Sequence, residues 1–387
     1  MKLETLLTRR VTEVIDKKHL TEALRSGRKL RVKLGIDPNR RELHLGHAVT
    51  LWKLREFQEA GHRAVFVIGD WTARIGDPSG KDKTRPALPE KEITVNTKEF
   101  FKQAHLILDK GKTEIHLQSE WFDKFGLSDV IRLSSLVTEK QILAHETFRE
   151  RIKKDLPFFH HETIYPLLQG YDSVAVRADV ELGAMEQKFN LLMGRTIQRA
   201  YGQKPQDVMM LQYLIGLDGK EKMSKSLGNF IALTDSADEM FGKIMSLPDN
   251  LIMQYFELAT EVPKQAIKEI TTTHPREQKI RLAKEIVSIY HGRKMAQAAV
   301  EAFETKFGKA GKGKVKADFE LKKKPGIYAV IDILLEGKLA SSKSEARRKI
   351  KEGAVEVDGV RVKNEKALVK ITKGSLIRLG KRFVRIT

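Results

Sequence analysis

Along the first third of the chain, the spacing of apolar residues alternates between a pattern typical of strands and a pattern typical of helices. Residues 29–37 (KLRVKLGID) alternate and then become apolar, and residues 61–70 (GHRAVFVIGD) form a nearly continuous apolar run. Such a run is typical of a strand that is buried on both faces. Residues 44–61 (HLGHAVTLWKLREFQEAG) and 93–111 predict helices, and residues 113–121 predict a third strand. This order of strands and helices predicts a parallel sheet with covering helices.

The rest of the chain divides into segments of different character. Residues 127–170 predict mostly helix and are expected to be inserted between two halves of the sheet domain, residues 1–217. An exposed polar loop and a helical domain are predicted for 218–305. Residues 306–324 hold eight lysines and three glycines, which indicates a flexible basic linker. A small domain, first helical and then rich in strands, is predicted for 325–387, so the fold class is α/β followed by α-helical and α+β domains.

Charge and composition narrow the classes of partner. The chain carries 71 Lys and Arg against 51 Asp and Glu, a formal net charge of +20, so a polyanion is its natural partner. It has no cysteine, which excludes disulfides and cysteine-bound zinc. The N-terminal stretch contains acids and no apolar core, unlike a signal or transit peptide, and no apolar run is long enough to span a bilayer. A cytoplasmic protein without membrane contact is expected.

Two histidines begin the helix predicted for residues 44–61. His44 and His47 are three residues apart, so they share one face of its first turn, where unpaired N–H groups and the helix dipole favour an anion. Gly46 between them allows a bulky group to approach the backbone. The pair predicts a phosphate site with two hydrogen-bond donors. Surface histidines without a role are an equal alternative for the pair alone, and no third metal ligand is evident.

A second motif, KMSKS (222–226), lies in a glycine-flanked loop after the last predicted strand. Lys222 and Lys225 are mobile cations that can close over a polyphosphate, although two loop lysines alone are more simply solvated surface residues. HLGH near the first strand and KMSKS after the last, in this order, resemble the two signature motifs of the class I aminoacyl-tRNA synthetases. The resemblance implies a Rossmann-like catalytic domain in residues 1–217, with both histidines and both lysines catalytic.

A stripe of polar residues predicts the wall of a ligand pocket. Tyr165, Gln169 and Asp172 in YPLLQGYD are spaced by four and three residues, so on a helix they lie on one face. Phenol, amide and carboxylate do not suit a core face, because buried polar groups need partners; a hydrated helix face is the alternative. This stretch and IGDPSGK (75–81) are similar to the tyrosyl-tRNA synthetase family. The similarity implies that Asp172 binds the substrate hydroxyl, and that Tyr165, Gln169 and Asp77 bind its α-amino group.

The same resemblance implies the remaining contacts. Gly35, Asp37 and Gln187 would complete the tyrosine site, and the ATP site would consist of Asn39, Gly46, Lys81, Arg85, Glu186, Met223, Ser224 and Lys225. Mg²⁺ is implied to accompany ATP, with no dedicated protein metal site. The implied partners are tRNA(Tyr), tyrosine, ATP and a second copy of the chain, which would pair through the helices of 127–170.

Three positions depart from the family pattern. The usual Gly-Gly-Thr/Ser-Asp-Gln stands here as GAMEQ (183–187), so Glu186 replaces the aspartate expected at the ATP ribose, and ribose binding should survive with a shifted geometry. Asn39 replaces a threonine near the terminal phosphates, which should cost little because an amide can also donate. Lys33 stands where other branches carry a tyrosine that reaches the substrate hydroxyl, so that contact is open here.

The tail carries a third resemblance. Residues 337–362 (GKLASSKSEARRKIKEGAVEVDGVRV) resemble the αL RNA-binding motif. A helix with a basic face is predicted, with Gly353 at its end and a hairpin turn at Asp358-Gly359. Its polar face would consist of Ser342, Lys343, Ser344, Arg347, Arg348 and Lys351, of which the four basic residues are predicted to bind tRNA phosphates. An ordinary basic surface helix is the alternative.

The resemblance covers nearly the whole chain and implies one reaction. Tyrosine would be activated with ATP to tyrosyl-adenylate and pyrophosphate, and the tyrosyl group would pass to the terminal ribose of tRNA. Two alternatives stay open: a tryptophan-specific relative with a similar pocket, and a non-catalytic RNA-binding relative that keeps the fold.

Overall fold

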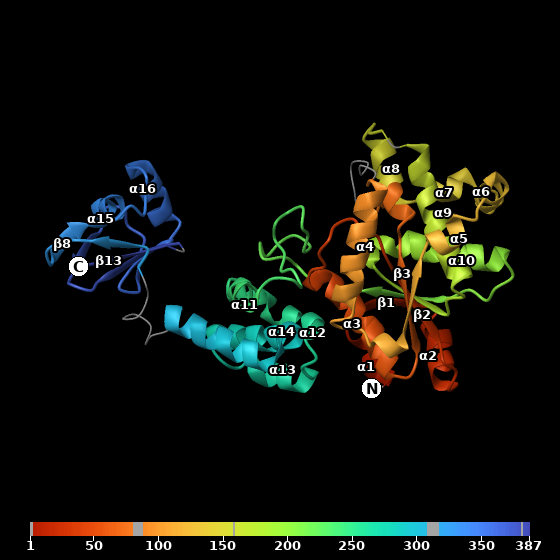
Figure 1. Ribbon diagram of the computed structural model, residues 1–387, viewed down its shortest axis with the longest axis horizontal. Helices are drawn as coiled ribbons and strands as arrows, with labels where there is room; N and C mark the ends of the chain where they lie inside the picture. Colours follow the sequence, from red (N-terminus) through yellow and green to blue (C-terminus); the bar gives the residue numbers. More distant parts are fainter. Residues whose placement is uncertain (1–2, 80–87, 158, 308–316, 381) are drawn as a thin grey trace. The chain divides into compact units, whose positions relative to one another are not determined.

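The computed structural model describes residues 3–79, 88–157, 159–307, 317–380 and 382–387 (Figure 1). Its contacts divide the chain into two compact units, Met1–Arg293 and Lys294–Thr387. The division falls inside helix α14 (Pro275–Phe307), next to Gly292, where φ of 82° and ψ of 160° interrupt the helical backbone. The contacts therefore end the first unit earlier than the boundary at residue 305 that the sequence predicts.

A six-stranded sheet forms the centre of the first unit, in the order β1-β6-β5-β2-β3-β4. Its strands are β1 (Val11–Ile15), β2 (Arg31–Ile36), β3 (Arg63–Ile68), β4 (Thr113–Leu117), β5 (Val180–Ala184) and β6 (Asp207–Leu211). The five strands from β6 to β4 are parallel, so the predicted α/β fold is confirmed. β1 is an antiparallel edge strand that lies outside the predicted elements. Its pattern is only half-buried, because its outer edge has no neighbouring strand.

Helices cover both sides of this sheet (Figure 1). α3 (Leu45–Glu59) packs against β2, β3 and β5, and α10 (Lys188–Ala200) packs against β5 and β6. The apolar run of β3 is buried from Ala64 to Ile68 as a consequence. The other helices of the sheet domain are α1 (Leu3–Thr8), α2 (Lys17–Arg25), η1 (Thr72–Arg74), α4 (Glu90–Ala104), η2 (Lys110–Lys112), α5 (Ser119–Phe122) and η3 (Met185–Gln187).

Helices follow α5 and β6, in the segments for which the sequence predicts a helical insertion and a helical domain. The insertion consists of α6 (Leu127–Ser134), α7 (Glu139–Ile142), α8 (Glu146–Lys153) and α9 (His160–Ala175), and thus ends five residues later than predicted. After β6 come α11 (Ala237–Met245), η4 (Asp249–Leu251), α12 (Ile252–Ala259), α13 (Lys264–Ile270) and α14. α12 packs against α3, so the helical region contacts the sheet domain directly.

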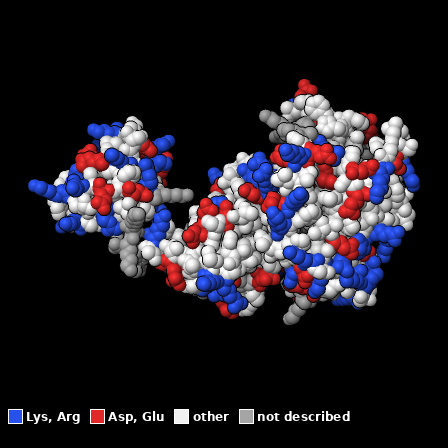
Figure 2. All heavy atoms as spheres, viewed as in Figure 1, with Lys and Arg blue, Asp and Glu red and all other residues white. Residues whose placement is uncertain are grey.

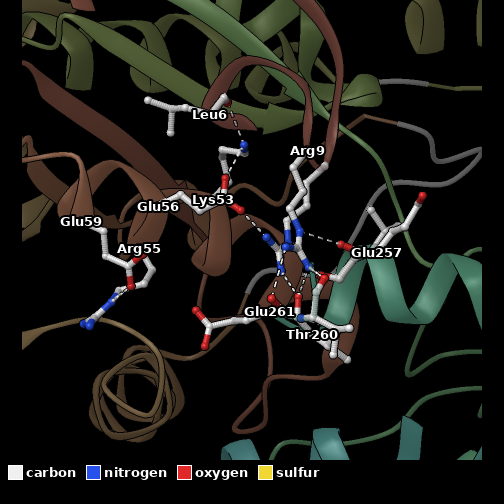
Figure 3. Close-up of polar contacts among 12 residues, drawn as sticks. Leu6, Arg9, Lys53, Arg55, Glu56, Glu59, Glu257, Thr260 and Glu261 are labelled. Carbon is white, nitrogen blue, oxygen red and sulfur yellow. Dashed lines mark hydrogen bonds and ion pairs between the residues drawn. The ribbon is translucent and has the colours of Figure 1, made fainter. Parts of the chain in front are cut away.

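A buried polar network fastens α12 to the N-terminal segment (Figure 3). Arg10 donates to the carbonyl oxygens of Leu258 (2.9 Å) and Thr260 (2.6 Å), which lie at the C-terminal end of α12, and it forms an ion pair with Glu56 of α3. Lys53 donates to the Leu6 carbonyl oxygen (2.9 Å) and also pairs with Glu56. The arginine satisfies carbonyl groups that the end of a helix leaves without partners.

The second unit is a small α+β domain. Its five-stranded sheet has the order β10-β9-β12-β13-β7, and β11 pairs with β8. The elements are β7 (Phe319–Leu321), β8 (Gly326–Ala329), α15 (Val330–Glu336), α16 (Lys343–Lys351), β9 (Val355–Val357), β10 (Val360–Val362), β11 (Leu368–Ile371), β12 (Leu376–Leu379) and β13 (Arg382–Ile386). Apolar side chains of both helices and both sheets, including Ile333, Ile350 and Val384, form one core.

Two expectations for the tail are resolved by this unit. Asp358 and Gly359 have positive φ (49° and 81°) and join β9 to β10 as the predicted hairpin turn. The prediction that all of 306–324 is linker is wrong, because α14 continues to Phe307 and β7 pairs in parallel with β13. The short β7 is paired with a strand that lies more than sixty residues later in the chain, which a local pattern cannot show.

Candidate functional site

The start of α3 carries the histidine pair at the carboxyl end of the sheet. His44 is the N-cap residue, with an extended backbone (φ −128°, ψ 170°), and its Nδ1 accepts the backbone N–H of Gly46 (3.1 Å). His47 Nδ1 accepts the backbone N–H of His44 (3.2 Å). The two rings lie 3.8 Å apart between centroids. The histidines therefore replace the usual capping residues, and they do so with the same ring atom.

Both rings are neutral at physiological pH. Burial, together with Lys225 and Lys222, lowers the pKa of His44 to about 3, and burial and the neighbouring ring hold the pKa of His47 well below 6.5. Because each Nδ1 accepts a backbone N–H, each neutral ring carries its proton on Nε2. The pair thus supplies two neutral N–H donors, and the positive charge of the site comes from other groups.

The loop with KMSKS lies directly against this helix start. Leu45 donates its N–H to the Ile231 carbonyl oxygen (3.0 Å), Leu233 donates to Leu43 (2.9 Å), and His44 forms a β-bridge with Ala232. A Cβ atom placed on Gly46 would lie 3.6 Å from Met223 Cβ. The same Cβ would lie 2.9 Å from the His44 ring, so a side chain at this position would collide with the cap.

The loop has more burial and more internal hydrogen bonds than its polar sequence predicts. Met223 is buried, and Asn229 accepts from the Ser224 backbone N–H (2.7 Å) and donates to Asp218 (2.6 Å). The prediction of a fully exposed loop is therefore wrong at Met223. The methionine packs inward beside Gly46 and leaves the polar residues of the motif on the outer side.

The two lysines of the motif contact different segments of the sheet domain. Lys222 forms an ion pair with Glu186 of η3, and Lys225 donates to the Glu42 carbonyl oxygen before α3. Burial lowers the pKa of Lys225 to about 8, which still leaves it mostly protonated at pH 7. A neutral histidine pair beneath two cations is a site for a polyanion.

A chain of hydrogen bonds crosses the ends of the parallel strands. Tyr165 on α9 donates its hydroxyl to Asp37 (2.9 Å), which follows β2, and Thr72 donates to the other oxygen of Asp37 (2.6 Å). The backbone N–H of Thr72 donates to the Gln118 side-chain oxygen (2.9 Å), and the Thr72 hydroxyl oxygen lies 2.9 Å from the same atom. Gln118 in turn donates to Asp172 (2.8 Å). The polar stripe of α9 is therefore joined at two points to the carboxyl ends of β2, β3 and β4.

Asp172 is buried within this chain. Burial raises its pKa to about 7, although Lys33 and the hydrogen bond from Gln118 favour the charged form. Gln169, one turn earlier, has a buried side-chain oxygen without a hydrogen-bond partner among the described residues. A buried acceptor of this kind indicates a place where a ligand donates.

A second polar group lies around Asp77. Gln187 donates to Asp77 (2.8 Å), and Asn190 of α10 donates to Gln187 (3.1 Å) and Ser79 (3.3 Å). Asp77 also accepts the backbone N–H of Ser79 (2.9 Å). These contacts bring the GDPS stretch and the GAMEQ stretch together, as the family resemblance implies.

The other predicted residues lie as follows. Gly35 is exposed, and Asn39 is half-buried in the loop between β2 and α3. Lys81 and Arg85 lie outside the described residues. Thr72, Gln118 and Asn190 belong to the site but are missing from the prediction. A signal for the first two exists, because each is a polar residue that follows the end of a parallel strand.

The predicted RNA-binding residues lie on α16 of the second unit. Lys343, Arg347, Arg348 and Lys351 are exposed, whereas Ala346 and Ile350 are buried in the core. Arg347, Arg348 and Lys351 line one shallow hollow together with Ser344 and Glu352. Ser342 is the N-cap and accepts the backbone N–H of Glu345 (3.2 Å). Figure 2 shows that Lys and Arg side chains are also spread widely over the visible face of both units.

A His and carboxylate cluster lies at the opposite edge of the sheet. Asp16, His19 and Asp207 are the one group of described residues with ligand atoms close enough for a metal ion. His19 and Asp207 form an ion pair (2.9 Å), and Asp16 caps α2, so each side chain already has a structural partner. Among the described helices, none combines the length and apolar character needed to cross a membrane.

Comparison with known proteins gives the class of the fold and site. Residues 25–308 match the family model described as tRNA synthetases class I (W and Y), and residues 316–384 match the tyrosine–tRNA ligase SYY-like C-terminal domain. The chain therefore belongs to the class I tRNA synthetases.

The relatives specify the family more closely. Tyrosine–tRNA ligase of Thermotoga maritima is 45% identical over 99% of this chain and 96% of its own length, and that of Moorella thermoacetica is 44% identical over 98% and 94%. This chain belongs to the tyrosine–tRNA ligase family, as the sequence resemblance implies.

Solved structures agree on the fold. A C-terminally truncated mitochondrial tyrosyl-tRNA synthetase of Aspergillus nidulans covers 79% of this chain and 93% of its own, with a TM-score of 0.67 at 20% identity. Tyrosyl-tRNA synthetase of Archaeoglobus fulgidus, solved with L-tyrosine, covers 78% of this chain and 100% of its own, with a TM-score of 0.63 at 24% identity.

Proposed function

We propose that this protein joins tyrosine to ATP, giving tyrosyl-adenylate and pyrophosphate, and then transfers the tyrosyl group to the 3′-terminal ribose of tRNA(Tyr). The observation that carries the proposal is the meeting of two distant motifs. Gly46 at the start of α3 lies beside Met223 of the loop and next to the His44 ring, and the two lysines of the loop reach Glu186 and the Glu42 carbonyl oxygen.

The chemistry needs positioning rather than a protein nucleophile. The tyrosine carboxylate is already charged and attacks the α-phosphate of ATP, so the protein has to align the two groups and stabilise the charge that develops. His44 and His47 would donate from Nε2 to the phosphate as its phosphorus becomes five-coordinate. Lys222 and Lys225 would exchange their present partners, Glu186 and the Glu42 carbonyl, for the departing pyrophosphate.

The rest of the ATP would lie beside the same two motifs. Gly46, Met223 and Ser224 would contact the adenosine and the phosphates through the backbone, and Asn39 would donate to the terminal phosphates. Glu186 would accept from the ribose once Lys222 leaves it. Lys81 and Arg85 complete the set that the family resemblance implies.

The tyrosine would lie against α9. Asp172 would accept the phenol hydroxyl, and the buried oxygen of Gln169, together with Tyr165 and Asp77, would receive the ammonium group. The Tyr165 hydroxyl already donates to Asp37, which holds the ring of Tyr165 beside these groups. Gly35, Asp37 and Gln187 would complete the wall. Phenylalanine lacks the hydroxyl and would leave the buried carboxylate of Asp172 without that partner, which disfavours it.

The second unit would bind tRNA. Lys343, Arg347, Arg348 and Lys351 present four cations on one exposed face of α16, which suits a phosphate backbone. The net charge of +20 over the chain supports the same partner.

Three further features belong to this proposal. Mg²⁺ would enter bound to the phosphates of ATP, as part of the substrate, and no dedicated protein site for it is proposed. Two copies of the chain would pair through the insertion, where the apolar side chains of Leu127 (76% exposed) and Ile131 (60% exposed) lie on α6. The protein would work in the cytoplasm.

Amino-acid-dependent exchange of pyrophosphate into ATP tests the proposal. Exchange that depends on tyrosine, followed by charging of tRNA(Tyr), is the expected result. Exchange with tryptophan in place of tyrosine would identify a tryptophan-specific relative. Binding of tRNA without exchange with any amino acid would identify a non-catalytic RNA-binding protein, and either result would overturn the proposal.

A further inference from the structure

A completely buried lysine lies next to α9, which carries the proposed tyrosine contacts, and the proposed reaction does not use this lysine. Lys33 is 0% exposed on β2, next to Glu181 (1% exposed) on β5, and the two residues are direct neighbours in the register of the parallel strands. Their side chains form an ion pair of 2.8 Å. An ion pair in a dry interior costs desolvation energy and needs a reason beyond packing.

The ammonium group of Lys33 has all of its protons engaged. It lies 2.8 Å from Glu181, 2.9 Å from the Ser173 hydroxyl and 2.9 Å from the carbonyl oxygen of Gln169. Ser173 also donates to Glu181 (3.1 Å), and Gln206 donates to the same carboxylate. Lys33 therefore has no proton left to donate to a substrate, and any effect it has on the reaction must act through its neighbours.

These neighbours belong to the α9 turn that carries the proposed tyrosine contacts. Gln169 and Ser173 lie on either side of Asp172, one turn of helix apart. Lys33 thus holds the same helical turn from which the side chains of Gln169 and Asp172 would contact the ligand. Gly194 of α10 makes room for this cluster, because a Cβ there would lie 2.6 Å from Gln206 and 3.0 Å from the Ser173 hydroxyl.

The charges around Asp172 come from four elements. Lys33 on β2 favours its ionised form, and so do the hydrogen bond from Gln118, after β4, and the nearby indole of Trp121 on α5; Glu181 on β5 opposes it less strongly than Lys33 favours it. Burial alone acts in the opposite direction and is the largest influence on the pKa of Asp172, which lies at about 7. The balance is close enough that the loss of one cation changes which form prevails.

We propose that Lys33 is a positioning residue for tyrosine selection, which fixes the Gln169–Ser173 turn through its hydrogen bonds and favours the charged form of the Asp172 carboxylate that accepts the phenol hydroxyl. This inference rests on the proposed function. It assigns a role to a lysine that forms no contact with the substrate. Lys33 thereby acts on Asp172 through its positive charge and not through a hydrogen bond.

Lys33→Met tests the inference, with pyrophosphate exchange measured for tyrosine and phenylalanine between pH 6 and 9. Loss of a nearby opposite charge raises a carboxyl pKa by about one unit or more. The ionised fraction of Asp172 at pH 7 would then fall from about one half to about one tenth. We expect kcat/KM for tyrosine to fall about fivefold relative to the wild type at pH 7, to recover at pH 9, and to leave phenylalanine nearly unchanged.

Two matched variants separate this role from the cost of an altered core. Lys33→Met/Glu181→Gln removes both charges, so it avoids an unpaired buried carboxylate and should keep the same direction of change with a smaller size. Lys53→Met removes an equally buried lysine that pairs with Glu56, and should lower stability without changing the preference for tyrosine over phenylalanine.

The possible outcomes are distinct. A loss that is equal for both amino acids and at all pH values would show a merely structural role and overturn the inference. Unchanged tyrosine kinetics in the folded double variant would also overturn it. A wild type without tyrosine-dependent exchange would instead contradict the proposed function, which the same experiment measures first.

Discussion

His47 allows the sharpest test of the phosphate site, because the two nitrogens of its ring have different roles. In His47, Nδ1 accepts the His44 backbone N–H (3.2 Å), and Nε2 carries the proton that would reach the phosphate. His47→Ala removes both. The lost cap costs about 0.5–2 kcal/mol of stability. The lost donor, if it acts on the transition state, costs about 10²–10³ in kcat.

His47→Gln separates the two contributions. A glutamine at this position can still accept the N-cap N–H, as in a capping box. Its amide nitrogen is attached to the same carbon as the accepting oxygen, so it cannot reach the far side where the imidazole Nε2 lies. We expect His47→Gln to recover the stability of the wild type to within about 0.5 kcal/mol but to stay at least tenfold slow in adenylate formation.

The assay is single-turnover formation of tyrosyl-adenylate, with tyrosine affinity measured in parallel. Tyrosine affinity should change little in either variant, since the loss belongs to the transition state. The pKa of His44 and of His47 lies far below its ordinary value, so the neutral rings prevail above about pH 6 and the loss should be equal at pH 6.5 and 8.0. Full recovery of the rate in His47→Gln, or equal losses of rate and affinity, would refute this reasoning and assign the ring to capping alone.

Three further predictions concern other parts of the molecule. Arg10→Met leaves Glu56 and the end of α12 without the buried guanidinium, and should lower the free energy of unfolding by about 3–5 kcal/mol, measured as a shift of the first urea transition. The partly exposed Arg55, which pairs with Glu59 on the same helix, should change it by less than about 0.5 kcal/mol when replaced by methionine. Glu186→Asp shortens the partner of Lys222 by one methylene and should slow adenylate formation about tenfold, whereas an unchanged rate would place the ribose contact elsewhere. A chain that ends at Lys306 lacks α16 and should keep pyrophosphate exchange while tRNA charging falls more than tenfold; undiminished charging would remove the tail from the mechanism.

Local patterns in the sequence are sufficient for the main elements of the sheet. The inner parallel strands β3, β5 and β6 are buried along most of their length, so their apolar runs show them without any knowledge of their neighbours. The two exceptions are strands whose burial depends on distant partners. β1 is an edge strand that pairs only with β6, and β7 pairs only with β13. Neither has a pattern strong enough to stand out from a helix or a linker.

The site residues divide in the same way into those that a local sequence pattern shows and those that depend on contacts between distant segments. The two motifs are visible because each is a compact run of unusual residues, and the helix stripe is visible because its spacing is regular. The bridging roles of Thr72 and Gln118 depend on which strands are adjacent, which the sheet order alone decides. The burial of Lys33 is likewise invisible in KLRVKLGID, where a lysine in an alternating strand predicts an exposed position.

A structure bound to a non-hydrolysable analogue of tyrosyl-adenylate tests the central claim most directly. The account predicts that the group replacing the α-phosphate lies at the start of α3, between Gly46 and Met223, within hydrogen-bond distance of a histidine Nε2, and that the phenol oxygen lies at Asp172. An analogue bound with its phosphate substitute away from α3, or with the phenol turned away from Asp172, would contradict it.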